Sequence, residues 1–170
     1  DRALAFSRKA RLSGRTLPWA VMIEGFVAQA RRQPDIAAER LREAREIRTP
    51  ETSRYHAQLL RLDASILFGE GRIRETRDRL FDALRIIRRG DFSYGRTLDA
   101  LAATYAAENN FYAEPLFQAA VRAKEEVGDL PGLAVTFGQL GRFYFDSENY
   151  ELAEVWFKRD LEESSERDDA

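Results

Sequence analysis

Apolar residues recur three and four positions apart along most of the chain. This spacing is seen at Leu59, Leu62 and Ile66, and again at Leu80, Ala83, Leu84 and Ile87. It places apolar side chains on one face of an α-helix, whereas the strict alternation of a half-buried strand does not persist over a strand's length. The pattern therefore predicts an all-α fold.

Short runs rich in glycine, proline, aspartate and asparagine interrupt this periodicity. Thr49 followed by Pro50 suits a helix start, and Gly90 and Gly128 suit C-terminal caps, where glycine adopts a positive φ without strain. Together the breaks predict about nine helices of ordinary length joined by short connections. The breaks lie at residues 16–18, 33–35, 49–51, 69–71, 90–91, 109–110, 128–132 and 147–149.

Small residues recur at a nearly constant interval. They are followed four positions later by Ser7, Leu41, Leu80, Phe117 and Phe157, and seven positions later by Ala10, Ala44, Ala83, Ala120 and Asp160. A matching triplet at each interval indicates a structural repeat. The small residues are Ala3, Ala37, Thr76, Ala113 and Ala153, at separations of 34, 39, 37 and 40 residues.

The last repeat carries the most complete motif. Phe137, Leu140-Gly141 and Tyr144 fall on one predicted helix, and Tyr150, Ala153 and Phe157 on the next. In this respect the chain resembles the tetratricopeptide repeat (TPR) family, whose paired helices carry a bulky residue, a Leu-Gly or Leu-Ala pair and a Tyr, then Ala, an aromatic residue and Ala. The resemblance implies a right-handed α-α superhelix (solenoid) of antiparallel helix pairs. Gly141 and Ala153 would then allow the helices to cross closely, with the aromatic rings packed beside them.

The register divides the chain into a leading helix and four helix pairs. We expect a single TPR-like domain over residues 1–170, as a fragment of a larger protein in which residues 1–12 are the trailing helix of a preceding repeat. Pro115 offers two alternatives, because proline inside a helix loses a hydrogen bond: its helix starts late, near Glu114, or is kinked. The predicted helix pairs span residues 16–48, 50–89, 92–128 and 130–168.

Composition is that of an ordinary globular domain. The 170 residues are 44% hydrophobic and 33% charged, and 27 basic residues nearly balance 29 acidic ones. The sequence has no cysteine, no apolar run long enough to cross a bilayer and no segment resembling a signal peptide. We expect a cytoplasmic protein with no membrane partner.

Catalytic motifs are absent from the sequence. His56 is the only histidine, and carboxylate pairs such as Glu125-Glu126 are adjacent, so their side chains diverge on a helix. Gly69 and Gly71 lack the strand–turn–helix context of a phosphate loop. The sequence predicts no enzyme, no catalytic residue, no metal site and no cofactor.

Arginines cluster at residues 72–89, which raises nucleic-acid binding as an alternative. Glu75, Asp78 and Asp82 lie among them at spacings that allow ion pairs within one helix. An exposed, ion-paired helix face is the favoured interpretation, and nucleic-acid binding is disfavoured.

The resemblance implies a concave groove, lined by the first helix of each pair, that binds a peptide or protein. An arginine recurs at Arg61, Arg96 and Arg142 and could hold carboxylates, while the first repeat offers an apolar anchor. We expect a scaffold that binds a partner as a regulatory or assembly segment, with self-association into a homo-oligomer as the alternative. The groove positions are Trp19, Met22, Phe26 and Gln29, then Gln58, Arg61, Ser65 and Phe68, then Arg96, Asp99 and Ala103, and finally Val135, Gly138, Arg142 and Phe145.

Overall fold

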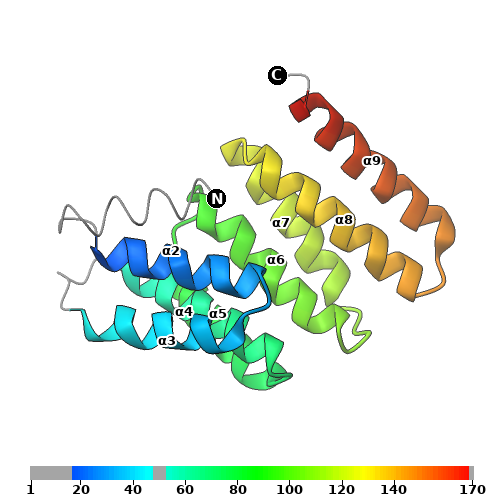
Figure 1. Cartoon of the computed structure of the whole chain (residues 1–170). Coiled ribbons are helices and arrows are strands. Elements are labelled where there is room, and N and C mark those ends of the chain that lie inside the picture. The colour runs from blue at the N-terminus through cyan, green and yellow to red at the C-terminus, as the bar shows by residue number, and fades with distance from the viewer. Residues whose placement is uncertain (1–16, 48–52, 169–170) are drawn as a thin grey trace. The chain divides into compact units, whose positions relative to one another are not determined.

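The computed structural model describes residues 17–47 and 53–168, and most of these residues are helical (Figure 1). No strand occurs within these two ranges, so the predicted all-α class is confirmed, and the eight helices described come close to the nine expected. The helix predicted at residues 2–12 and the helix start predicted at Thr49–Pro50 lie outside the described residues. The helices are α2 Leu17–Ala30, α3 Pro34–Glu46, α4 Ser53–Gly69, α5 Ile73–Ile86, α6 Phe92–Ala106, α7 Ala113–Val127, α8 Leu130–Asp146 and α9 Tyr150–Asp168.

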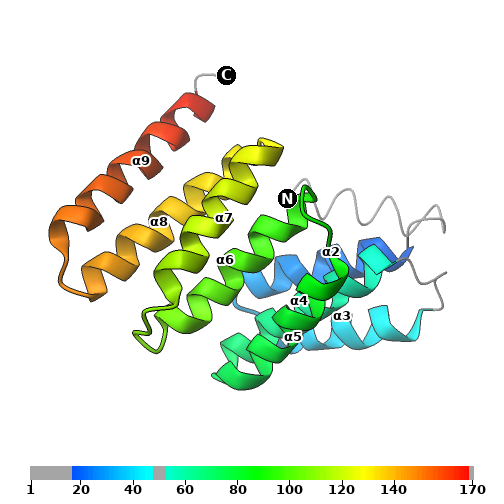
Figure 2. The same ribbon diagram turned by 180° about the vertical axis from the view of Figure 1, so that it is seen from behind.

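The helices divide into two compact units, unit 1 (residues 1–87) and unit 2 (residues 88–170). In unit 1, α2 packs along α3 and α4 along α5, while α4 also contacts α2 and α3. In unit 2, α6 packs along α7 and α8 along α9, while α8 also contacts α6 and α7. Figure 2 shows the two helices of each pair running side by side in opposite directions. Stacked pairs of this kind are the architecture of helical repeat proteins.

The small residues of the predicted repeat lie where helices pack. Ala37, Thr76, Ala113 and Ala153 are all buried, which supports the register read from the sequence. The next two positions of each triplet are also buried in α3, α5 and α7, but Phe157 and Asp160 of α9 are partly exposed. In α7 the equivalent ring of Phe117 is covered by α8, where it lies 6.3 Å from the ring of Phe143.

Helix starts and ends follow the local chemistry of the chain. The carboxylate of Asp91 accepts a hydrogen bond from the backbone N–H of Ser93 at the start of α6. Gly128 ends α7 with a φ of +68°, as expected for a C-terminal cap. The two alternatives for Pro115 are also resolved, because α7 begins at Ala113 and Pro115 falls in its first turn, where its missing N–H breaks no helical bond.

Close helix contact in the last pair occurs at Gly141, as predicted. A Cβ atom on Gly141 would lie 2.6 Å from the ring of Phe157, so only glycine admits the ring in this position. Leu140, Tyr144 and Ala153 are buried around it. The prediction that Tyr150 is a packing residue is wrong, since this side chain is more than half exposed.

Candidate functional site

The predicted groove face of unit 1 joins α2 to α4. The guanidinium carbon of Arg61 lies 5.7 Å from the ring centre of Phe26, a cation–π contact. Nearby, the amide nitrogen of Gln29 donates to the backbone oxygen of Ser65 at 2.6 Å. Four of the predicted residues therefore come together, and their contacts with one another tie the two helices of this face.

The apolar end of the same face is mostly core. Met22 is only 2% exposed, so the prediction that it lines an open groove is wrong: its side chain packs in the core of unit 1. Trp19 is partly buried. Its ring packs edge-on against that of Tyr55, with the two ring centres 5.4 Å apart. Phe68, at the end of α4, remains partly exposed.

Arg96, on α6, already binds a carboxylate of its own unit. Its Nε and one terminal nitrogen donate to the two oxygens of Asp129, each at 2.7 Å. Asp129 is buried and also accepts from the backbone N–H of Gly132 at 3.2 Å, which caps the start of α8. The hydrogen bonds from Arg96 hold the pKa of the Asp129 carboxyl below its usual value. This pair therefore fixes α8 to α6.

Asp99, on α6, is buried, and the prediction that it faces a groove is wrong. Its carboxylate pairs with the Lys124 ammonium group of α7 at 3.2 Å. Lys124 also donates to the backbone oxygen of Gly132 at 2.9 Å and to the hydroxyl of Thr136, both on α8. Burial lowers the pKa of Lys124 despite the neighbouring carboxylate. One ammonium group thus ties three helices together.

Sequence reasoning missed both Lys124 and Asp129. A signal for Lys124 was present, because it follows Phe117, Ala120 and Val121 at the spacing of the buried face of α7. A lysine at such a position implies a buried partner. Asp129 offered a weaker signal as the residue before the Leu130-Pro131 helix start.

α8 carries the predicted groove residues that remain open. Val135, Arg142 and Phe145 are each more than half exposed, and Gly138 lies between them on the same stripe. The Arg142 side chain is 82% exposed and lies 3.9 Å from the Asp146 carboxylate. This α8 face, Val135, Gly138, Arg142 and Phe145, therefore offers two apolar side chains around a cation.

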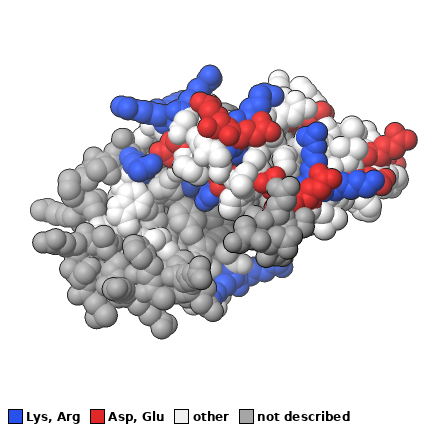
Figure 3. Space-filling model, turned by 90° about the horizontal axis from the view of Figure 1, so that it is seen from above, with Lys and Arg blue, Asp and Glu red and all other residues white. Residues whose placement is uncertain are grey.

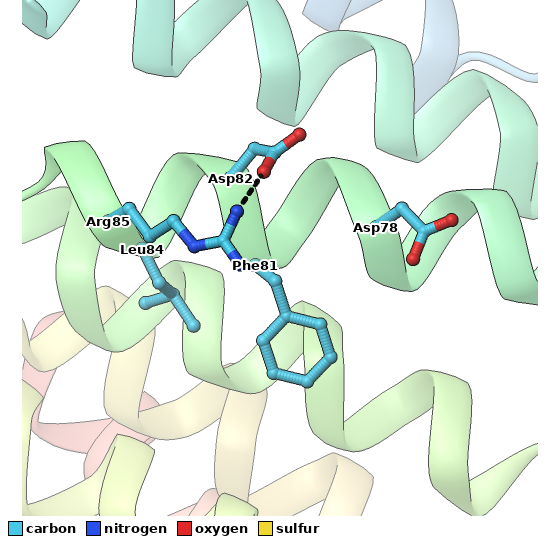
Figure 4. A pocket seen from close by; sticks show the side chains of 5 residues that line it. All are labelled: Asp78, Phe81, Asp82, Leu84 and Arg85. Carbon is cyan, nitrogen blue, oxygen red and sulfur yellow. Dashed lines mark hydrogen bonds and ion pairs between the residues drawn. The ribbon is translucent and has the colours of Figure 1, made fainter.

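The arginine-rich helix α5 borders an open hollow of about 490 Å³ lined by Asp78, Phe81, Asp82, Leu84 and Arg85. Figure 4 shows the Arg85 guanidinium turned toward Asp82, to which it donates at 2.8 Å. Arg72, the N-cap of α5, likewise pairs with Glu75, so the predicted ion pairing is confirmed for Glu75 and Asp82. On the face shown in Figure 3, the basic and acidic side chains of the described residues are intermixed and do not form separate patches of one charge.

Two kinds of feature are absent from the described ranges, residues 17–47 and 53–168. Among these residues, no three His, Cys, Asp or Glu side chains are grouped to hold a metal ion. No helix there combines the length and apolar character needed to cross a bilayer.

Comparison with known proteins identifies the fold but no family. No protein-family model matches the chain, and no curated protein matches it significantly. Among solved structures, BtubC (BKLC) from P. vanneervenii superimposes with a TM-score of 0.70, covering 97% of this chain and 70% of its own, at 17% identity. MamA superimposes with a TM-score of 0.54, covering 98% of this chain and 90% of its own, also at 17% identity. At this identity the likeness shows the fold alone, that of a helical repeat protein.

Proposed function

We propose that this chain is a non-enzymatic helical repeat module that binds a protein or peptide partner through the α8 face. The observation that carries the proposal is the exposure of Val135 and Phe145 on either side of Arg142. Large apolar side chains that are left open on a regular helix face, beside a charge that can fix orientation, are typical of protein contact surfaces.

The TPR resemblance supports the same function. In a TPR-like domain over residues 1–170, α8 is the first helix of a pair, and such helices line the ligand-binding face. We infer a cytoplasmic regulatory or assembly segment of a larger protein, with TPR membership carried by the motif from Phe137 to Phe157.

Of the three arginines predicted to bind a partner, only Arg142 is proposed to do so. Arg96 already holds Asp129, and Arg61 lies over Phe26, whereas the Arg142 side chain extends into solvent beside Asp146. We therefore assign the recognition of a partner carboxylate to Arg142, and apolar contact to Val135 and Phe145. Nucleic acid fits this surface poorly, because binding to phosphates needs several cations. The α8 face has one, Arg142.

The test is a selection of peptides from a displayed random library, followed by affinity measurement on synthetic peptides. Val135→Asp should weaken binding at least about tenfold, because a carboxylate would be desolvated at the contact. Val155→Asp on α9 is the matched control, since the two valines are 55% and 47% exposed.

Circular dichroism should show both variants equally helical. The proposal fails if the selected peptides bind the Val135→Asp variant as tightly as the parent chain, or if Val155→Asp weakens them just as much.

A further inference from the structure

Two turns meet at one end of unit 2. The turn between α6 and α7 and the turn between α8 and α9 lie together in both ribbon views (Figures 1 and 2). The hydroxyl of Ser147 donates to the side-chain oxygen of Asn109 at 3.4 Å, which links the two turns directly. Side chains that leave these turns therefore share one surface.

Four exposed aromatic rings lie in these turns or next to them, two at each turn. Phe111 is 74% exposed, and Tyr112, Phe145 and Tyr150 are each more than half exposed. The rings pair across short distances, with centres 4.1 Å apart for Phe111 and Tyr112 and 5.5 Å apart for Phe145 and Tyr150. We name these four residues the aromatic corner. Exposed apolar surface gathered in this way marks an interaction site more often than isolated exposed residues do.

The charges around the aromatic corner are almost all negative. The sequence contains no lysine or arginine at residues 97–121 or at residues 143–157. Arg96 and Arg122 border the first stretch, and Arg142 and Lys158 border the second. The exposed carboxylates of the two turns and their flanks belong to Glu108, Asp146, Glu148 and Glu151.

This combination selects for a cation. The face of an aromatic ring carries negative potential and attracts ammonium and guanidinium groups, and nearby carboxylates add charge-assisted hydrogen bonds. The same carboxylates repel phosphates, so nucleic acid and anionic membranes are poor occupants. An arginine side chain can contact both the rings and the carboxylates, since its planar guanidinium group stacks on aromatic rings and forms paired hydrogen bonds with carboxylates.

We propose that the aromatic corner docks an arginine- or lysine-bearing segment of a partner protein. The aliphatic part of each basic side chain lies on the rings, and its charged end reaches the carboxylates of Glu148 and Glu151. This site shares only Phe145 with the α8 face, which is expected to select carboxylates. The two surfaces can therefore be tested, and can fail, separately.

The probe is a random 12-residue peptide library displayed on phage and selected on the whole chain carrying Val135→Asp, which disables the α8 face. Enriched peptides should be rich in arginine and lysine. Synthetic copies with a fluorescent label, measured by anisotropy, should bind more weakly as salt rises, because the contact is electrostatic.

Two pairs of variants identify the binding surface. Phe111→Ala/Tyr150→Ala should weaken these peptides at least about tenfold, since two ring contacts are lost. Phe92→Ala, at the start of α6, should leave the affinity unchanged, although Phe92 is 51% exposed. Glu148→Lys/Glu151→Lys should weaken binding, whereas Glu125→Lys/Glu126→Lys on α7, with the same change in net charge, should not.

Several results would overturn the proposal. One is a selection that enriches no peptide. Another is a set of enriched peptides without an excess of basic residues, and a third is a set that binds Phe111→Ala/Tyr150→Ala as tightly as the parent chain. Light scattering gives a further check on the unlabelled wild-type chain. Salt-sensitive oligomers that disappear in the Phe111→Ala/Tyr150→Ala variant would show that the occupant is a second copy of the chain.

Discussion

The ammonium group of Lys124 lies in the core of unit 2, where α6, α7 and α8 meet. It is 1% exposed, and the carboxylate of Asp99, the backbone oxygen of Gly132 and the hydroxyl of Thr136 surround it. A buried charge is tolerated only when its partners replace water. Lys124 and Asp99 are therefore best understood as one structural element rather than as candidate ligand contacts.

Removing one member of this pair should be severe. Lys124→Met leaves the Asp99 carboxylate buried without its ammonium partner, so we expect the free energy of unfolding to fall by about 3–5 kcal/mol. Urea denaturation followed by circular dichroism measures the change. The double variant Asp99→Leu/Lys124→Met should recover most of the loss, because well-packed apolar residues replace an ion pair at little cost.

The same substitution at an exposed ion pair is the control. Lys158 pairs with Glu154 on the surface of α9, and Lys158→Met should change stability little because solvent screens that pair. A Lys124→Met variant as stable as the wild type, or a double variant less stable than Lys124→Met alone, would contradict the structural role of the pair.

At the scale of single residues, the sequence predicted which helix face a residue lies on better than it predicted which partner its side chain contacts. The repeat register placed Val135, Arg142 and Phe145 on one stripe, and all three are exposed. It also placed Met22 and Asp99 on groove faces, yet both are buried. The register fixes where a position points on its helix. It does not reveal that Lys124, on another helix, points at Asp99.

Several helix boundaries were predictable because local chemistry sets them. The prediction of Gly90 as a C-terminal cap is wrong, since α5 ends at Ile86 and the extended residue Ile87 is its cap. Asp91 and Gly128 act within a turn of their own positions, so their caps show directly in the sequence. Pro115 left a late helix start and a kink both open, and the start of α7 at Ala113 decided between them. The crossing glycine Gly141 was also predictable, since it belongs to the repeat motif. Gly95, on α6, was not, because it falls outside that motif and its neighbour is a side chain of α7.

Gly95 and Gly138 make a matched test of helix packing. A Cβ atom on Gly95 would lie 2.7 Å from Cγ of Lys124 and 3.3 Å from the backbone oxygen of Ala120, so the helices must shift. At Gly138 it would meet the carboxylate end of Asp160 at 3.0 Å, and that end can rotate away.

We expect the two alanine substitutions to act in opposite directions. Alanine is the better helix former by about 1 kcal/mol, so Gly138→Ala should be neutral or stabilising. Gly95→Ala should destabilise by about 1–3 kcal/mol, because overpacking outweighs that gain. The thermal unfolding midpoint measures both, and equal shifts in the two variants would contradict this account of the α6–α7 crossing.

The all-α repeat class could be predicted for the whole molecule because it depends on many positions at once. The three- and four-residue spacing recurs in every helix, and the small residues from Ala37 to Ala153 recur once per pair, so single departures such as Asp160 do not obscure it. The candidate sites depend on a few side chains each. The aromatic corner needed the structure, because Phe111 and Tyr150 are 39 positions apart and a turn contact brings their surroundings together.

Unit 2 has its own apolar core and its own buried polar contacts. Its core cluster, from Ala102 to Ala153, and the polar bridges of Lys124 and Arg96 all lie within residues 88–170. Repeat proteins draw stability from each pair and its nearest neighbours. We infer that the shared core and the two polar bridges let this block of two stacked pairs fold alone. Residues 88–170 expressed alone should therefore be helical and unfold cooperatively in urea. Lys124→Met should destabilise this fragment by about the same 3–5 kcal/mol as in the whole chain. A fragment without a cooperative transition would show instead that unit 2 depends on the rest of the chain for its stability.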